Sequence, residues 1–414
     1  MRLIKIRDRI VKQNFRKPLG DIFLSIASRM VPLFVLQFLI HPLLSADLTE
    51  NDYGILLNII ALVSLVGVTF GNVLNNSRLI SQKWYDKQGV IGDYNVMLLC
   101  FVCLNLIVMT YYMSFGNISG SGLELMMLIV LSVLMIVNGY ISVEFRIKLN
   151  YLKFAKEGFC LGFGYVVGYV LYTYTGYWHL IYLVGVLFSF TYLVINTSLL
   201  NESVRVTSNL KGTVKRTLAL LVSGLLVSLG TYLDRIILLP LVGGKAVSVY
   251  FVATLLGKTL GLAVGPLSGL LLSYLAPRRE AFNREFTRHL LLGLLLCIIS
   301  YVIINCIDEY ILRILYHKQY KEAIGIVPVA TASVLILLLC NLLNSYVLNF
   351  TSSLWQVVIN IAFVLSYLVL SIIFFKAHGL IGFSIGILFA SLLKLVLIII
   401  LFYSRNHSLV KNYV

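Results

Sequence analysis

The sequence predicts an all-α, polytopic membrane protein with about twelve transmembrane helices. Two properties of its composition lead to this fold class. Only 12% of the 414 residues are charged, whereas a soluble domain needs roughly a quarter to solvate its surface, and 59% are hydrophobic. A third observation is that apolar runs of about 20 residues recur along the whole chain, and each can cross a hydrocarbon core of about 30 Å.

We place the transmembrane segments by these runs. In chain order they lie near residues 19–44, 53–77, 94–115, 123–143, 158–175, 177–200, 214–239, 246–275, 288–306, 323–348, 354–375 and 379–403. The first segment follows a basic tail, as in a signal peptide, but it is too long for one and an acidic stretch follows it, so we expect an uncleaved span. The boundary between the fifth and sixth segments depends on Gly176 and its neighbours.

The distribution of basic residues gives the orientation. With the N-terminus in the cytoplasm, the terminal tails and cytoplasmic loops carry 24 of the 33 Lys and Arg residues. The outer loops carry five, namely Lys245, Arg313, Lys318, Lys321 and Lys376. This asymmetry predicts an even number of spans with both termini in the cytoplasm. It also accounts for the net charge of +16 without nucleic-acid binding.

The other four cations, Arg29, Arg235, Lys258 and Lys394, fall inside predicted spans. A cation at the centre of a transmembrane helix costs about 2.5–3.5 kcal/mol on insertion scales, so such residues usually face the bundle interior or a wet cavity. Helical spacing supports that placement. The clearest polar stripe contains Lys258 and consists of Tyr250, Thr254, Gly257, Lys258, Gly261, Gly265 and Ser268.

Arg29 and Arg235 also lie on polar helix faces, formed by Asp21, Ser25, Ser28, Arg29 and Pro32 and by Gly224, Ser228, Thr231 and Arg235. We therefore predict a cavity with cationic fixed charges, in which Arg29, Arg235, Lys258 and Lys394 bind the substrate. Such a cavity suits an anionic ligand. Asp21 and Asp234 are candidates for gating or ion coupling.

Each of these residues also has a purely structural interpretation. Asp234 could neutralise the adjacent Arg235, and Arg235 or Lys394 could extend to the membrane interface. Asp21 could complement the dipole of a helix N-terminus. The paired glycines of the fifth span, Gly158/Gly162 and Gly164/Gly168, favour close helix packing.

Nothing in the sequence indicates hydrolysis. The stretch Gly243-Gly244-Lys245 lacks the earlier glycine and the following Ser or Thr of a phosphate-binding loop. The six cysteines lie in apolar runs, where small buried side chains are the expectation. We predict no enzyme activity, no metal site and no cofactor.

Three segments together resemble the bacterial polysaccharide-transporter family, the O-antigen flippases of the multidrug/oligosaccharidyl-lipid/polysaccharide (MOP) exporter superfamily. They are the basic tail and first span followed by Leu48-Thr-Glu-Asn-Asp-Tyr53-Gly54, the segment Tyr232-Leu-Asp-Arg-Ile-Ile-Leu-Leu239, and the segment Val249-Tyr250-Phe-Val-Ala-Thr-Leu-Leu-Gly-Lys258. The similarity in length and span number extends over the whole chain.

This resemblance implies two pseudo-symmetric six-helix lobes around a central cavity. The corresponding domains are a basic tail at 1–18, an N-lobe at 19–205 and a C-lobe at 206–414. The implied substrate is an oligosaccharide unit on undecaprenyl pyrophosphate, moved to the outer leaflet of the bacterial inner membrane by alternating access. A polysaccharide polymerase and a chain-length regulator are implied partners, besides membrane lipids.

Two alternatives remain at this point. A multidrug or cation exporter of the same superfamily would need carboxylates to handle protons and cations, whereas the charges within these spans are mostly positive. A membrane-embedded polysaccharide polymerase usually has a large outer loop, whereas the largest one here, near 307–322, is short.

Overall fold

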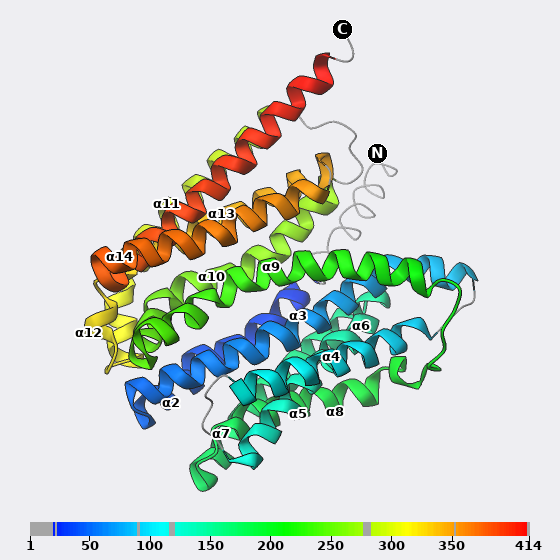
Figure 1. Cartoon of the computed structure of the whole chain (residues 1–414), viewed down its shortest axis with the longest axis horizontal. Coiled ribbons are helices and arrows are strands. Elements are labelled where there is room, and N and C mark those ends of the chain that lie inside the picture. Colours follow the sequence, from blue (N-terminus) through cyan, green and yellow to red (C-terminus); the bar gives the residue numbers. More distant parts are fainter. Residues whose placement is uncertain are drawn as a thin grey trace, which may run out of the picture. The chain divides into compact units, whose positions relative to one another are not determined.

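The computed structural model describes residues 20, 23–88, 92–115, 121–275, 283–351 and 353–411. All regular secondary structure in these residues is helical (Figure 1). The first helix, at 23–34, continues through the π-helix η1 (Val35–Ile40) into α2 (His41–Asp47). The predicted all-α fold is therefore confirmed.

The remaining elements follow in chain order. They are α3 (Glu50–Gln88), α4 (Asp93–Phe115), α5 (Gly122–Ile141), α6 (Val143–Ile147), α7 (Tyr151–Thr175), α8 (His179–Asn196), η2 (Leu199–Asn201), α9 (Leu210–Val242), α10 (Gly244–Leu275), α11 (Asn283–Leu315), α12 (Tyr320–Ala323), α13 (Val327–Phe350) and α14 (Ser353–Lys411).

Each of the twelve predicted segments is helical over most of its described length. Within the described residues, nine helical stretches are long and apolar enough to cross a membrane. One of them covers both the eleventh and twelfth predicted segments, because α14 is interrupted by non-helical backbone at His378 and Gly379. Besides these nine, α7 contains the fifth predicted segment and α10 contains the eighth. The polytopic membrane architecture is therefore confirmed.

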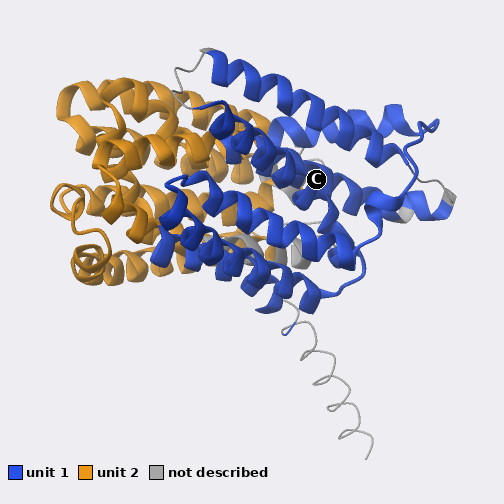
Figure 2. Cartoon of the chain, turned by 90° about the horizontal axis from the view of Figure 1, so that it is seen from below, with its two compact units in different colours: residues 1–40, 63–224 blue, residues 41–62, 225–414 orange. Residues whose placement is uncertain are grey.

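The chain forms two compact units, coloured separately in Figure 2. Unit 1 comprises residues 1–40 and 63–224, and unit 2 comprises residues 41–62 and 225–414. The chain passes between the units within three helical stretches, at Ile40–His41, Leu62–Val63 and Gly224–Leu225.

Unit 1 is held together by close helix packing at glycines. A Cβ added at Gly168 would lie 2.7 Å from the Ile181 Cα atom, so α7 and α8 touch at their backbones. A Cβ at Gly158 would lie 2.1 Å from the Ser28 carbonyl oxygen, so the first helix meets α7 in the same way. The predicted packing role of the glycines in the fifth span is confirmed.

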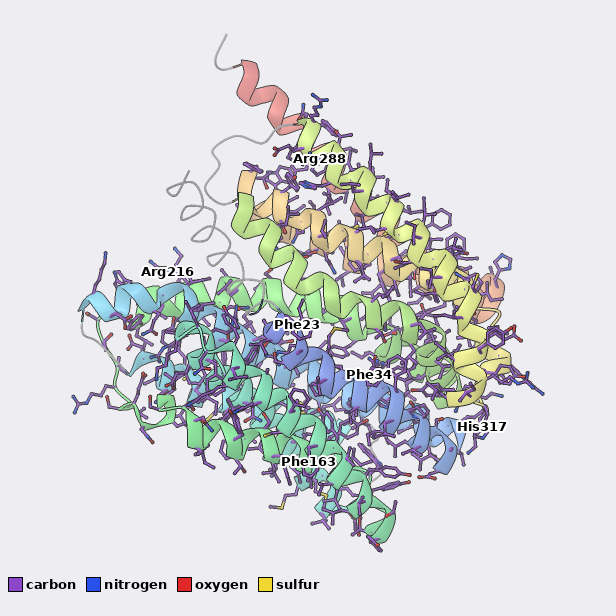
Figure 3. The ribbon with its side chains drawn as sticks, turned by 180° about the vertical axis from the view of Figure 1, so that it is seen from behind. Phe23, Phe34, Phe163, Arg216, Arg288 and His317 are labelled. Carbon is purple, nitrogen blue, oxygen red and sulfur yellow. The ribbon has the colours of Figure 1, made fainter. Side chains whose placement is uncertain are left out.

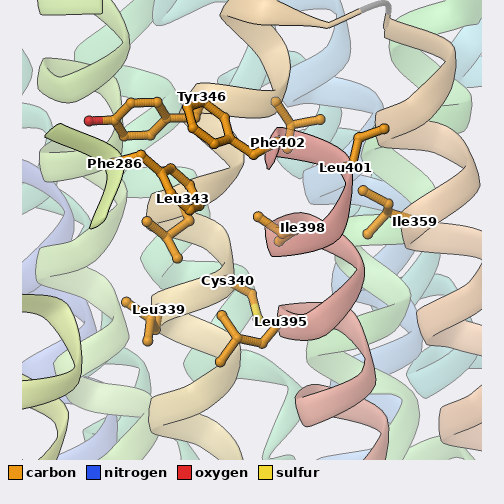
Figure 4. Packing of buried hydrophobic residues seen from close by; sticks show 11 residues of the cluster. Phe286, Leu339, Cys340, Leu343, Tyr346, Ile359, Leu395, Ile398, Leu401 and Phe402 are labelled. Carbon is orange, nitrogen blue, oxygen red and sulfur yellow. The ribbon is translucent and has the colours of Figure 1, made fainter. Parts of the chain in front are cut away.

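Unit 2 has a hydrophobic core between α11, α13 and the second half of α14 (Figure 4). Phe286 stacks on Phe402 with ring centroids 4.0 Å apart, and Tyr346 packs edge-on against both rings. Leu343 extends the core along α13, and Ile398 extends it along α14. Leu271 of α10 also packs against this core.

In unit 1, loops that we predict on the cytoplasmic side meet one another. Arg78, near the end of α3, donates two hydrogen bonds to the Glu202 carboxylate, at 2.8 and 2.6 Å. Asp93 accepts hydrogen bonds from the backbone and side chain of Thr207, and Glu144 accepts one from the Ser198 backbone. These contacts hold the segment 197–209, which joins α8 to α9, against two other predicted connections, near 78–93 and 144–157.

In unit 2, loops that we predict on the outer side meet in the same way. Lys245 pairs with Glu50 and Glu322, at 3.2 and 2.6 Å. Lys318 donates to the carbonyl oxygens of Ala46 and Leu48. The observed neighbours thus agree with the alternation of loops in the predicted topology.

The exposed side chains of the long helices are mostly apolar. Phe23, Phe34 and Phe163 are 62–70% exposed and project from their helices (Figure 3). In the most apolar stretch of α11, only 6% of the residues are buried. Arg288 lies near the start of this helix, and His317 follows its last residue, Leu315. Such a surface needs a lipid environment.

Candidate functional site

The four predicted cations lie on four different helical segments. Arg29 is on the first helix in unit 1, and Arg235, Lys258 and Lys394 are on α9, α10 and α14 in unit 2. Asp21 lies outside the described residues. We describe the pockets of the two units separately.

Unit 1 contains a pocket of about 120 Å3. Its lining combines apolar residues with Arg29, Asn72, Asn138, Ser142, Glu157 and Ser189. The Asn138 side-chain oxygen is buried without a hydrogen-bond partner. The pocket is therefore polar and large enough for several water molecules.

Arg29 is an exposed residue of this pocket. Its guanidinium lies over the Phe154 ring, 5.1 Å from the ring centroid, which is a cation–π distance. The close contact between Ser28 and Gly158 fixes the first helix on α7 next to this position. Arg29 can therefore meet a ligand while its side chain rests on α7.

Glu157 is the acidic group of the same pocket, and the sequence interpretation missed it. The residue is 5% exposed. Its carboxylate accepts a hydrogen bond of 2.5 Å from the Ser189 hydroxyl and interacts electrostatically with Arg29. The predicted fifth span begins at 158, where the apolar run begins, whereas α7 begins at Tyr151. Helical spacing could have revealed Glu157, because Leu161 and Tyr165 follow it at four-residue intervals and line the same pocket.

Unit 2 contains a smaller pocket of about 30 Å3, with room for about one water molecule. The Lys258 ammonium group lies 2.5 Å from one oxygen of the Asp234 carboxylate. The other oxygen of Asp234 is buried without a hydrogen-bond partner. Tyr250 and Tyr367 also line the pocket and interact electrostatically with the Asp234 carboxylate. Asp234 thus forms its ion pair with Lys258, from the next helix, and not with its neighbour Arg235.

Arg235 is placed among aromatic side chains. Its guanidinium lies 4.7 Å from the Phe251 ring centroid and 6.0 Å from that of Tyr232. His41 packs against Phe251 and lies near the Tyr53 hydroxyl, at 3.2 Å. Aromatic faces stabilise the guanidinium charge without neutralising it.

Lys394 is buried in unit 2, with 5% exposure, and is not among the residues that line the pocket with Lys258. Its ammonium group lies 4.8 Å from the Phe363 ring centroid and 3.5 Å from the Asn341 side-chain oxygen. The side chain therefore does not extend to a surface, and its contacts are those of a packed residue.

No group of three or more His, Cys, Asp or Glu residues that could hold a metal ion is found in the described part of the chain. The two pockets instead each combine one cation with one acid. The pair of Arg29 with Glu157 defines the candidate site of unit 1, and the pair of Lys258 with Asp234 defines that of unit 2.

No family model and no curated protein matches the sequence. Solved structures do match. The lipid II flippase MurJ in an inward closed conformation is 14% identical, with a TM-score of 0.70, over 92% of this chain and 85% of that chain. A MATE in the straight conformation is 12% identical, with a TM-score of 0.65, over 95% and 96% of the two chains.

An outward-facing multidrug resistance MATE family transporter of the MOP superfamily is 13% identical, also with a TM-score of 0.65, over 94% of this chain and 96% of that chain. Identities of 12–14% show the fold alone. The chain has the fold that is common to the lipid II flippase MurJ and the MATE transporters.

Proposed function

We propose that this chain is a flippase that moves an oligosaccharide unit on undecaprenyl pyrophosphate from the cytoplasmic to the outer leaflet. The observation that carries this proposal is the exposed Arg29 at a polar pocket inside the membrane-spanning part of unit 1, in a fold similar to that of a lipid II flippase. A guanidinium binds phosphate oxygens in a bidentate manner, and a desolvated site strengthens that interaction.

In this proposal, residues 19–205 and 206–414 form two lobes that alternately open the site to each side of an inner membrane. Both termini lie in the cytoplasm. Arg29 and Arg235 meet the pyrophosphate or acidic sugars, and Lys258 with Asp234 forms a charge pair that responds to ligand or ion binding. A polymerase and a chain-length regulator receive the flipped unit.

The test is complementation of surface polysaccharide in a strain that lacks its own flippase. R29A and R235A should each lower the amount of polysaccharide at normal protein levels, because each removes a cation that meets the anionic head group. R288A is the matched control, since Arg288 is an exposed cation near the start of α11. Full activity of both R29A and R235A would contradict the assignment.

A second candidate function is export of a cationic drug. Two observations favour it: the MATE structures match nearly the full length of both chains, and the carboxylates of Glu157 and Asp234 are buried beside pockets. Ethidium efflux from cells separates the two functions. Efflux that E157Q or D234N abolishes, together with normal polysaccharide in R29A, would favour the exporter.

A further inference from the structure

The pocket of unit 1 contains opposite charges on two helices that touch. We propose that Glu157 is an internal competitor for Arg29. The deprotonated carboxylate partly neutralises the guanidinium, and protonation of Glu157 leaves Arg29 free to bind an anionic head group. The identity of that head group rests on the proposed flippase function, whereas the coupling between Arg29 and Glu157 does not.

The packing of the first helix on α7 brings the two residues together. Gly158 lets the Ser28 backbone approach so closely that a Cβ would clash at 2.1 Å. Arg29 and Glu157 are the chain neighbours of these two contact residues, and both line the pocket. The guanidinium also lies over Phe154, one helical turn before Glu157. The distance between the two charges is thus set by backbone contact and not by flexible loops.

The two charges differ in their access to a ligand. Arg29 is exposed, whereas Glu157 is 5% exposed and is held by the Ser189 hydroxyl. A bulky anion can reach the guanidinium without reaching the carboxylate. Water can enter the pocket, which has about 120 Å3, and supply a proton to Glu157.

The other ionisable groups around the pair are few among the described residues. Arg146 of α6 acts on Arg29 and donates to the side-chain oxygens of Asn75 and Asn76. Cys160 of α7 and Tyr192 of α8 interact electrostatically with the Glu157 carboxylate, and Tyr165 of α7 lines the pocket. Among the lining residues, Glu157 is the carboxylic acid that can offset Arg29.

The first experiment tests the coupling without any substrate. Dicyclohexylcarbodiimide reacts with protonated carboxyl groups in apolar surroundings, and peptide mass spectrometry then measures the adduct at Glu157. R29Q should raise the labelling of Glu157 by about an order of magnitude, because the carboxylate loses its stabilising cation. Glu144, which is buried and paired with Lys148, is the internal reference and should stay unchanged. Equal labelling of Glu157 in wild type and R29Q would overturn the proposal.

The second experiment measures binding of undecaprenyl pyrophosphate, without sugars, to the purified full chain in nanodiscs. The affinity of wild type relative to that of E157Q should rise by up to about tenfold as the pH is lowered, because protonation of Glu157 releases Arg29 while ionisation of the pyrophosphate affects both proteins alike. At high pH, E157Q should bind more tightly than wild type, and R29Q should bind weakly at every pH. E124Q is the matched control, because Glu124 is a carboxylate of the same unit that does not line the pocket and accepts a hydrogen bond from the Ser121 backbone. E124Q should keep the pH dependence of wild type.

Two results would overturn the competition. One is weaker binding by E157Q than by wild type, since Glu157 would then support Arg29 and not oppose it. The other is a pH dependence that is the same in wild type and E157Q. If labelling depends on Arg29 but the prenyl pyrophosphate does not bind, the flippase proposal and the competition for this head group both fail, while the charge coupling stands. Loss of polysaccharide in R29A with unchanged labelling in R29Q would leave the flippase and remove the competition.

Discussion

At the scale of single residues, the two pockets show how the molecule accommodates cations in apolar surroundings. Lys258 has Asp234 as a direct partner, Arg29 has Glu157 and an aromatic face, and Arg235 has aromatic faces. A buried ion pair repays its desolvation only when both partners are present. The acids are therefore as important to these sites as the cations that bind a ligand.

This argument predicts the effect of breaking the pair between Asp234 and Lys258. K258M should destabilise the protein by about 3 kcal/mol, because it leaves a buried carboxylate without a counter-ion. The double variant D234N/K258M should recover most of that loss, because it removes both charges. Thermal unfolding in detergent measures the difference. A double variant as unstable as K258M would show that the pair does not act as a unit.

The sequence predicted the cations better than the acids, for a physical reason. A lone cation within a long apolar run, such as Lys258, is conspicuous, and its polar stripe places it on an inward face. Glu157 and Arg78 lie just beyond apolar runs, so hydropathy assigns them to loops. Both are nevertheless buried within helices that continue past the apolar run. The pairing of an acid with a cation depends on how the helices pack against each other. It cannot be inferred from the periodicity of residues within one helix.

At the scale of helices, the contact between the first helix and α7 depends on one missing side chain. G158A should destabilise the protein by about 1–3 kcal/mol, because its methyl group would overlap the Ser28 carbonyl oxygen. G162A is the matched control one turn later, where a Cβ would lie 3.4 Å from the nearest atom, at Pro32. Thermal unfolding compares the two variants. Equal stability of G158A and wild type would mean that the helices can separate without cost.

The segment 197–209 is the second element whose position depends on a few contacts. E202Q should weaken the bidentate contact with Arg78 and loosen this segment, at a cost of about 2–3 kcal/mol, since Arg78 is buried. Limited trypsin digestion reports the change, because cleavage after the exposed Arg205 should become faster. Y140F removes one hydrogen bond to Arg78 and a longer one to Asn95 but keeps the ion pair, so it should have a smaller effect. Unchanged cleavage in E202Q would contradict this role of the ion pair.

At the scale of the whole molecule, composition and periodicity were sufficient for the fold class and for most helices. Apolar runs identify spans because the bilayer requires every backbone group to bond within its own helix. The helix ends were less predictable: α3 continues to Gln88 and α11 to Leu315, beyond the apolar runs near 53–77 and 288–306. The bounds of the two compact units could not be predicted either, because helices that pass from one unit to the other look continuous in the sequence.

The topology is the prediction that involves the whole chain. Gly176 ends α7 in a left-handed conformation and α8 begins at His179, so the fifth and sixth spans form a tight hairpin. With a cytoplasmic N-terminus, this hairpin lies outside and the segment 197–209 lies inside. In a cysteine-free background, Y177C should react with a membrane-impermeant maleimide in intact cells, whereas N201C should react only after permeabilisation. Labelling of both residues from the same side would mean that the hairpin does not cross the membrane, and it would reverse the alternation on which the 24-to-5 distribution of cations depends.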